Sequence, residues 1–175
     1  TRIVGDDGED LAQGEIGQMY FGNGPQIAYH NDPEKTAWVY HREGWITMGD
    51  MGRLDEEGYL YLSDRKDFMI ITGGVNVYPK EIEDLLSVHP AIADVAVFGV
   101  PNEEFGEEVK AVVQPTEWPE NETAFVEMLT AHCRAHLSPI KVPRSFDLAR
   151  ELPRQENGKL YKKALRAAYL AKAGA

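Results

Sequence analysis

The chain has 175 residues, 43% of them hydrophobic and 10% aromatic, which is enough to bury the core of one or two domains. Its formal net charge of −11 argues against nucleic acid as a general partner. No apolar run approaches the roughly 18 residues of a transmembrane segment, and no signal-peptide pattern occurs. The single cysteine, Cys133, excludes an intrachain disulfide framework and is typical of a reducing compartment, so we predict a cytoplasmic location.

Charge is unevenly distributed along the chain. Residues 1–140 hold 9 Lys/Arg and 26 Asp/Glu, a net charge of −17, whereas residues 141–175 hold 9 Lys/Arg and 3 Asp/Glu, a net charge of +6. The basic tail either contacts a negatively charged ligand or docks on the acidic remainder of the chain, and composition does not decide between these. The histidines form no HExxH pattern, and the pair His132 and His136 is interpreted as a surface pair. We therefore expect no metal site.

The first 65 residues have the pattern of short strands and turns. In the segment GEIGQMYFGN, we expect Ile16, Met19 and Phe21 to point inward. The segment GRLDEEGYLYLSDR predicts a hairpin, in which the turn DEEG precedes the alternating residues 59–62. This β unit has too little apolar material to be a free-standing domain.

A different pattern begins at residue 68, where FMII predicts a short buried strand. Pro79 suits the first position of a helix, and Pro90 ends that helix by about His89. The further expected elements are strands at residues 93–100, 107–115 and 142–149 and helices at residues 121–137 and 161–172. Together these elements predict a compact α+β domain of ordinary size.

Apolar stripes indicate which helix faces are buried. The helix at residues 121–137 carries a stripe spaced four residues apart, formed by Phe125, Leu129, Cys133 and Leu137. Cys133 is therefore interpreted as a core residue and not as a reactive thiol. In the last helix the residues expected to face inward are Leu165, Ala168 and Tyr169. The predicted fold class is α+β, with a β segment at residues 1–67 and a compact mixed domain at residues 68–175.

Standard nucleotide and hydrolase motifs are absent from the sequence. It contains no Walker A motif, no GxGxxG and no GxSxG. Four short segments could still bind a ligand or take part in a reaction: GWITMGD, DRKD, ITGGVN and QENGKL. Their key residues are Asp50, Arg65, the pair Gly73–Gly74, and Lys159. Each has a plainer alternative, respectively a turn cap, a surface ion pair, a tight turn and a solvated lysine.

The order and spacing of these segments resemble the C-terminal third of the adenylate-forming enzyme superfamily. That superfamily includes acyl-CoA synthetases, peptide-synthetase adenylation domains and firefly luciferase. The resemblance covers essentially the whole chain, through GEIGQMYF, YHNDPEKTA, GWITMGDMGRLDEEGYLYLSDRKDFMIITGGVNVYPKEIEDLLSVHP, VFGVPNEEFGEEVKAVV and ELPRQENGKLYKKAL. It implies an enzyme that activates a carboxylic acid with ATP as an acyl-adenylate and then transfers the acyl group to CoA.

The resemblance also implies a role for each matching residue. Asp50 and Arg65 would hold the ribose of ATP or AMP, and Asp67 would be the hinge about which the small domain turns. Lys159 would be the catalytic residue, bridging the substrate carboxylate and the α-phosphate. The CoA-contacting residues would be Gly73 and Gly74 in the pantetheine channel and Phe105 and Arg144 at the nucleotide. Mg²⁺ is expected for the parent enzyme, although no ligand for it is identifiable in this sequence.

The sequence departs from the family pattern in two ways. Met48 stands where the family commonly has Thr before Gly-Asp, with Thr47 one place earlier, which puts the ordering role of that hydroxyl in doubt. The phosphate-binding loop, the adenine site and the acyl pocket belong to a large N-terminal domain that is missing here. Residues 1–67 would be the tail of that domain, and we expect these 175 residues alone to be inactive.

Two other functions stay open at this point. One is an adenylation domain that loads a carrier protein, and the other is a noncatalytic binding module. The acid is not specified, because fatty, aromatic and other bulky apolar acids all fit the resemblance.

Overall fold

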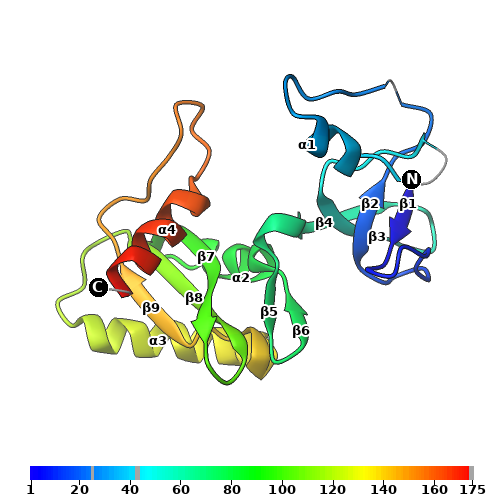
Figure 1. Cartoon of the computed structure of the whole chain (residues 1–175). Coiled ribbons are helices and arrows are strands. Elements are labelled where there is room, and N and C mark those ends of the chain that lie inside the picture. The colour runs from blue at the N-terminus through cyan, green and yellow to red at the C-terminus, as the bar shows by residue number, and fades with distance from the viewer. Residues whose placement is uncertain (25, 42–43, 174–175) are drawn as a thin grey trace. The chain divides into compact units, whose positions relative to one another are not determined.

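The computed structural model describes residues 1–24, 26–41 and 44–173. It divides the chain into two compact units, Thr1–Asp67 and Phe68–Ala175, which we call the N-terminal and C-terminal units. Each is built around its own sheet (Figure 1). The α+β class predicted from the sequence is confirmed. No helix in the described ranges is both long and apolar enough to span a bilayer.

The N-terminal unit is a four-stranded antiparallel sheet with a short helix, α1 (Pro33–Trp38). The strands lie in chain order: β1 (Arg2–Val4), β2 (Gly17–Tyr20), β3 (Asp50–Leu54) and β4 (Leu60–Arg65). The predicted hairpin is confirmed as β3–β4. Its turn is closed by Asp55, whose Oδ1 accepts the backbone N–H groups of Glu57 and Tyr59 at 3.1 and 2.8 Å.

Three details of this unit differ from expectation. Met19 is buried as predicted, but Ile16 is exposed because it precedes β2. The alternating residues 59–62, which indicated a strand of the hairpin, are all exposed, and residues 60–62 lie on β4 at the edge of the sheet. Helix α1 was not anticipated, although the Asp32 side chain caps it by accepting from the N–H of Lys35 at 2.9 Å.

The C-terminal unit holds a five-stranded sheet with three helices. Its strands run in the order β6 (Val75–Val77), β5 (Ile70–Thr72), β8 (Gly106–Pro115), β7 (Ile92–Asn102), and β9 (Ser145–Leu148) pairs with β8 in parallel. Its helices are α2 (Pro79–Ser87), α3 (Glu122–His136) and α4 (Lys162–Ala173), with a 3-10 turn at Pro139–Lys141. A second 3-10 turn, Lys66–Phe68, spans the boundary between the two units.

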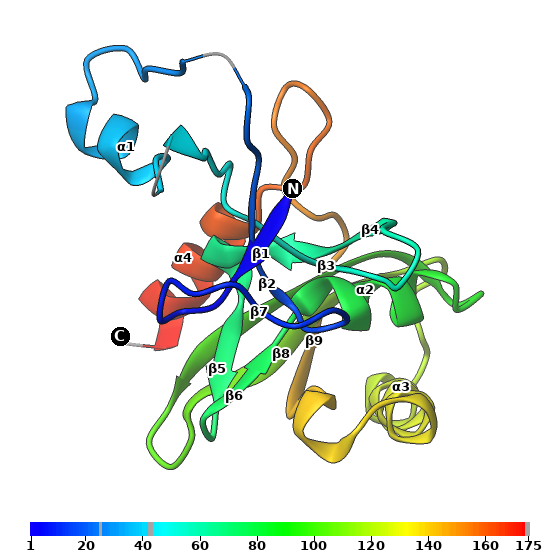
Figure 2. The same cartoon turned by 90° about the vertical axis from the view of Figure 1, so that its right-hand side faces the viewer.

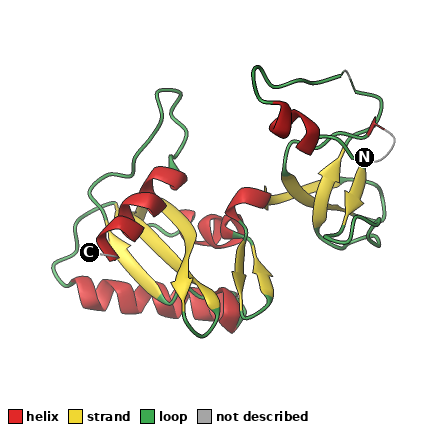
Figure 3. Ribbon diagram, in the orientation of Figure 1, coloured by secondary structure: helices red, strands yellow, loops and turns green. Residues whose placement is uncertain are grey.

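Both faces of this sheet are covered, which explains why β7 is almost continuously apolar. Val95 and Val97 point to the side of α2 and α3, in one core cluster with Ile82 and Leu129. Ala96, Phe98 and Val100 point to the opposite side, where Leu165 and Tyr169 of α4 pack. Figures 2 and 3 show α3 and α4 on either side of β7, β8 and β9. Successive strand residues therefore meet different helices.

Most predicted elements of this unit are found, with some boundaries moved. Cys133 is fully buried, which confirms it as a core residue, and burial raises the pKa of its thiol to about 11. Ala168 was expected to face inward, but it is exposed on α4. The strand predicted at residues 142–149 begins only at Ser145, after the turn that Pro139 opens. The strand predicted at residues 68–71 begins at Ile70, because Phe68 ends a 3-10 turn.

Candidate functional site

Asp50 and Arg65 face each other across the β3–β4 hairpin. They are register partners, and Arg65 Nε lies 3.7 Å from Asp50 Oδ1. The guanidinium is also fixed by Nη2, which donates to the Met48 carbonyl at 2.6 Å. Both side chains stay accessible, with 58% of the Arg65 side chain and 34% of the Asp50 side chain exposed. The sheet thus presents a carboxylate beside a guanidinium, a pair that can bind the hydroxyls of a diol.

Thr47 orders the loop that carries Asp50. Its hydroxyl is buried and accepts from Gly49 N at 3.0 Å and from Gln18 Nε2 at 3.1 Å. Gly49 has a φ of +80°, and a side chain there would meet the Trp38 ring at 3.0 Å. The Thr47 hydroxyl therefore orders the loop, although it stands one position earlier than the Thr of the family pattern. Met48, at that position, contributes its backbone carbonyl to Arg65.

A small cavity of about 230 Å³ opens beside Arg65. Its lining residues are Tyr29, Lys35, Trp38, Met48, Gly49, Arg65 and Asp67. Sites that enclose a whole drug-sized ligand are usually about 300–1,000 Å³. This cavity therefore suits one polar fragment of a ligand, such as a sugar.

In the C-terminal unit, Gly73 and Gly74 form the two-residue turn between β5 and β6. Their φ angles are +56° and +78°, and Thr72 pairs with Val75 across the turn. This geometry needs a positive φ at both positions, which glycine adopts without strain. The hairpin itself therefore accounts for the double glycine, and β6 was absent from the predicted elements. A side chain on Gly74 would meet nothing within 4 Å, so its backbone is open to a ligand.

Phe105 and Arg144, far apart in sequence, meet beside this turn. Gly73 N donates to the Phe105 carbonyl at 2.9 Å, and a side chain on Gly73 would lie 3.3 Å from the Phe105 ring. The Arg144 guanidinium lies over that ring, 4.2 Å from its centroid. A bare backbone, an aromatic ring and a cation therefore form one surface, which we call the hairpin cluster.

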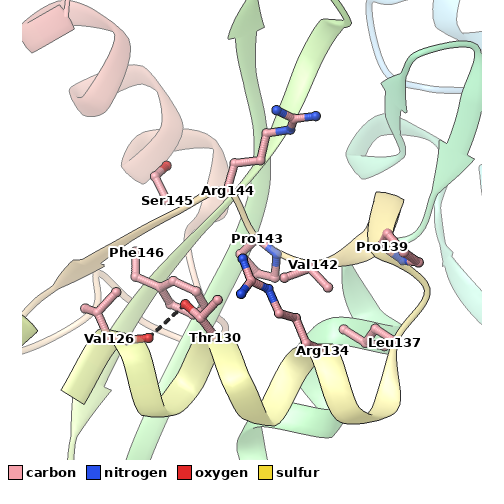
Figure 4. Close-up of a pocket in the computed structure, with 10 residues that line it drawn as sticks. All are labelled: Val126, Thr130, Arg134, Leu137, Pro139, Val142, Pro143, Arg144, Ser145 and Phe146. Atoms are coloured by element: carbon pink, nitrogen blue, oxygen red, sulfur yellow. Dashed lines mark hydrogen bonds between the residues drawn. The ribbon is translucent and has the colours of Figure 1, made fainter. Parts of the chain in front are cut away.

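A larger cavity of about 620 Å³ adjoins the hairpin cluster through Arg144. Figure 4 shows Arg134 reaching from α3 toward Pro143, and Arg144 extending from the segment above the helix. The other lining residues are Val126, Thr130, Leu137, Pro139, Val142, Pro143, Ser145 and Phe146. Two arginines and no carboxylate line this cavity, so it favours an anion. Arg134 was not among the residues predicted from the sequence, because only the folded chain brings α3 to the segment that carries Arg144.

Lys159 lies on a loop of the C-terminal unit that is held at its base. Arg154 forms an ion pair with Asp94 of β7, and its Nη1 donates to the Gly158 carbonyl at 2.7 Å. The Lys159 N–H donates to Asn157 Oδ1 at 3.0 Å. The Lys159 side chain is exposed and makes no ion pair in the described ranges. The loop therefore presents a free ammonium group from an anchored base.

The basic tail docks in part on the acidic remainder of the chain. Among the described residues, ion pairs join cations of this tail to earlier carboxylates: Lys141 with Glu81, Arg154 with Asp94, Lys162 with Glu83, and Arg166 with Glu107. Lys159 and Arg144 have no such carboxylate among the described residues and remain available to an anionic ligand. No group of three or more His, Cys, Asp or Glu side chains in the described ranges could hold a metal ion.

The predicted site residues thus fall into three places. Asp50 and Arg65 come together in the N-terminal unit, and Asp67 is the last residue of that unit. Gly73, Gly74, Phe105 and Arg144 come together in the C-terminal unit. Lys159 stands apart from the hairpin cluster, on its own loop.

Comparisons with known proteins identify the family that the chain resembles. Residues 81–159 match the family model of the AMP-binding enzyme C-terminal domain. The chain is 43% identical over 160 residues to a long-chain-fatty-acid–CoA ligase from Bacillus subtilis, covering 90% of this chain and 28% of that protein. It is 43% identical over 167 residues to an indoleacetate–CoA ligase from Aromatoleum aromaticum, covering 94% of this chain and 32% of that protein.

A solved structure with a similar fold is that of ATP-bound MatB from Rhodopseudomonas palustris. Its TM-score is 0.84 at 34% sequence identity, over 96% of this chain and 33% of that one. The chain therefore spans about a third of the length of the relatives that it matches.

Proposed function

The chain belongs to the adenylate-forming, AMP-binding enzyme superfamily, and on this premise we propose that it is the C-terminal part of an ATP-dependent acyl-CoA synthetase. Residues 1–67 would be the end of a large N-terminal domain, and residues 68–175 the small mobile domain. The whole enzyme would join a carboxylic acid to CoA in two steps. A substrate carboxylate oxygen first attacks the α-phosphorus of ATP and releases pyrophosphate. The CoA thiol then attacks the acyl carbonyl and releases AMP.

In the first step, Asp50 and Arg65 would hold the ribose hydroxyls, and Lys159 would approach the reacting groups. Bringing a carboxylate to a phosphate places two anions together, so a lysine between them offsets the repulsion and orients the attack. The accessible Asp50–Arg65 pair and the exposed Lys159 ammonium suit these roles. Mg²⁺ would accompany the ATP phosphates in this step, as it does in other nucleotide sites.

The observation that carries the proposal is the hairpin cluster. The second step needs a narrow route for the pantetheine arm, and Gly74 leaves its side of the turn open. The Arg144 guanidinium, held over the Phe105 ring, offers a planar cation on which the adenine base can stack and positive charge for phosphates. Arg134 and Arg144 at the 620 Å³ cavity would then donate hydrogen bonds to phosphate oxygens of the CoA nucleotide.

Binding of CoA to the 175-residue chain, measured by calorimetry, tests this proposal. Arg144→Met should weaken binding about tenfold, as expected for the loss of one charged contact to a phosphate. Arg150→Met is a matched control, since Arg150 also lies over an aromatic ring, that of Trp118, at 4.0 Å. Equal effects of the two substitutions would count against the hairpin cluster as the CoA site.

The same experiment distinguishes an acyl-CoA ligase from an adenylation domain that loads a carrier protein. A carrier protein delivers a pantetheine arm without the adenine nucleotide, so its site would not discriminate between pantetheine and CoA. We expect CoA to bind more tightly than pantetheine, with the difference lost in Arg144→Met. A noncatalytic module would bind neither.

A further inference from the structure

The β5–β6 hairpin has a limited backbone connection to the rest of its sheet. In the described residues the β5–β8 ladder consists of one pair, Thr72 with Gly106, and Gly73 N donates to the Phe105 carbonyl. The Ile71 N–H donates instead to a side chain, the Oε2 atom of Glu107, at 3.1 Å. A carboxylate therefore takes the place of a backbone acceptor beside the glycine turn.

The other oxygen of Glu107 is held by helix α4. Arg166 Nη2 donates to Glu107 Oε1 at 3.1 Å, and Arg166 Nε donates to the Gly99 carbonyl at 2.7 Å. The Glu107 side chain is only 28% exposed. Its carboxylate thus bridges a backbone amide of β5 and a guanidinium of α4, with each oxygen serving one partner.

Gly99 makes room for this arrangement. A side chain on Gly99 would lie 2.8–2.9 Å from the carboxylate atoms of Glu107, closer than real contacts allow. The glycine on β7 therefore lets the Glu107 carboxylate lie flat against the sheet, where it can reach the Ile71 amide.

We propose that Glu107, oriented by Arg166, is a positioning residue that holds the Gly73–Gly74 turn in place for the thiol substrate. The proposal rests on the proposed CoA function of the hairpin cluster. Glu107 acts through the turn and does not touch the ligand. Because Arg166 lies on α4, which begins three residues after Lys159, one helix would support both the lysine loop and the glycine turn.

Amide hydrogen exchange in the 175-residue chain tests the structural half of this inference. In Glu107→Ala, exchange at Ile71 and Gly73 should accelerate about tenfold, as expected for the loss of a hydrogen bond to a charged group. The Ala111 amide at the centre of β8 should keep its rate, which shows that the fold is intact. Glu107→Gln should restore part of the protection, because an amide oxygen still accepts from Ile71. Glu103→Gln, an exposed acid on the neighbouring turn, should change nothing.

Ligand affinity tests the functional half. Glu107→Ala should weaken CoA binding about fivefold and leave AMP binding unchanged, since Asp50 and Arg65 lie in the other unit. Unchanged exchange at Ile71 and Gly73 would overturn the positioning role, as would unchanged CoA affinity in a chain that does bind CoA. If the unaltered chain binds no CoA, the proposed function fails, and the exchange rates still decide whether Glu107 holds the turn.

Discussion

Lys162 donates to both carboxylate oxygens of Glu83, at 3.0 and 3.1 Å, and so ties the first residue of α4 to α2. The two side chains are only 11% and 14% exposed. Glu83 also accepts the Val97 N–H at 2.8 Å, and the Lys162 ammonium lies 4.7 Å from the ring centroid of Phe68. The pair therefore connects α4, α2, β7 and Phe68, the first residue of the C-terminal unit. Its lysine lies three positions after Lys159.

Breaking this pair should destabilise the C-terminal unit. We expect Lys162→Met to lower the free energy of unfolding by about 3 kcal/mol, because the mostly buried Glu83 carboxylate loses the ammonium that donates to both of its oxygens. Urea unfolding measures the effect. Lys159→Met should stay within about 0.5 kcal/mol of the unaltered chain, because that lysine is exposed. The double variant Glu83→Gln, Lys162→Met should recover part of the lost stability. If its loss equals the sum of the losses in the two single variants, the two residues are not coupled.

The two glycines of the hairpin turn should respond differently to asparagine, which tolerates a positive φ better than most residues. Gly74→Asn should cost little stability, since nothing lies near that position, but should obstruct the ligand and weaken CoA binding. Gly73→Asn should also destabilise the fold, by about 1–3 kcal/mol, because its side chain meets the Phe105 ring at 3.3 Å. Thermal unfolding and calorimetry separate the two effects. Unchanged CoA affinity in Gly74→Asn would argue against a ligand at this turn.

Local sequence patterns predicted the elements that local physics determines. The stripe ending at Leu137 gave α3, and Pro79 marked the first residue of α2. The short β6 strand was missed because three residues carry too little periodicity to distinguish a strand from a loop. Ala168 was misplaced because alanine is compatible with either face of a helix.

The residues of the candidate site also divide into those predicted from the sequence and those found only in the structure. Asp50, Arg65, Gly73, Gly74 and Lys159 could be named from the sequence, because their segments match a family pattern. Arg134, Glu107 and Gly99 could not, because each acquires its surroundings only when distant segments meet: Arg134 at the cavity that Arg144 also lines, and Glu107 between Ile71 and Arg166. Such contacts depend on the register of β7 and β8 and on the placement of α3 and α4.

His89 should make the C-terminal unit less stable in acid. Its pKa is lowered from 6.5 by desolvation first and by the neighbouring His132 second, with ring centroids 5.0 Å apart. His136 in turn lies 4.7 Å from His132, and His89 Nδ1 accepts the Ala91 N–H at 3.2 Å, which protonation would prevent.

The lowered pKa of His89 determines how the free energy of unfolding changes with pH. Below about pH 6.5 the unfolded chain binds a proton that the folded chain resists, so the free energy of unfolding should fall as pH drops until the folded pKa is passed. Thermal unfolding between pH 7.5 and 5 measures the loss, which should be smaller in His89→Asn. An equal loss in the variant would assign the acid sensitivity to other groups.

Asp67 is the last residue of the N-terminal unit and lies in the 3-10 turn Lys66–Phe68. If it is the hinge of the parent enzyme, Asp67→Pro should restrict rotation there, because proline fixes φ near −65°. Adenylation, measured as carboxylate-dependent pyrophosphate exchange, should then survive better than thioester formation, measured as acyl-CoA release. Asp67→Ala removes the carboxylate without stiffening the backbone and should spare both steps more than proline does. Equal loss of the two steps in Asp67→Pro would be incompatible with a hinge at this residue.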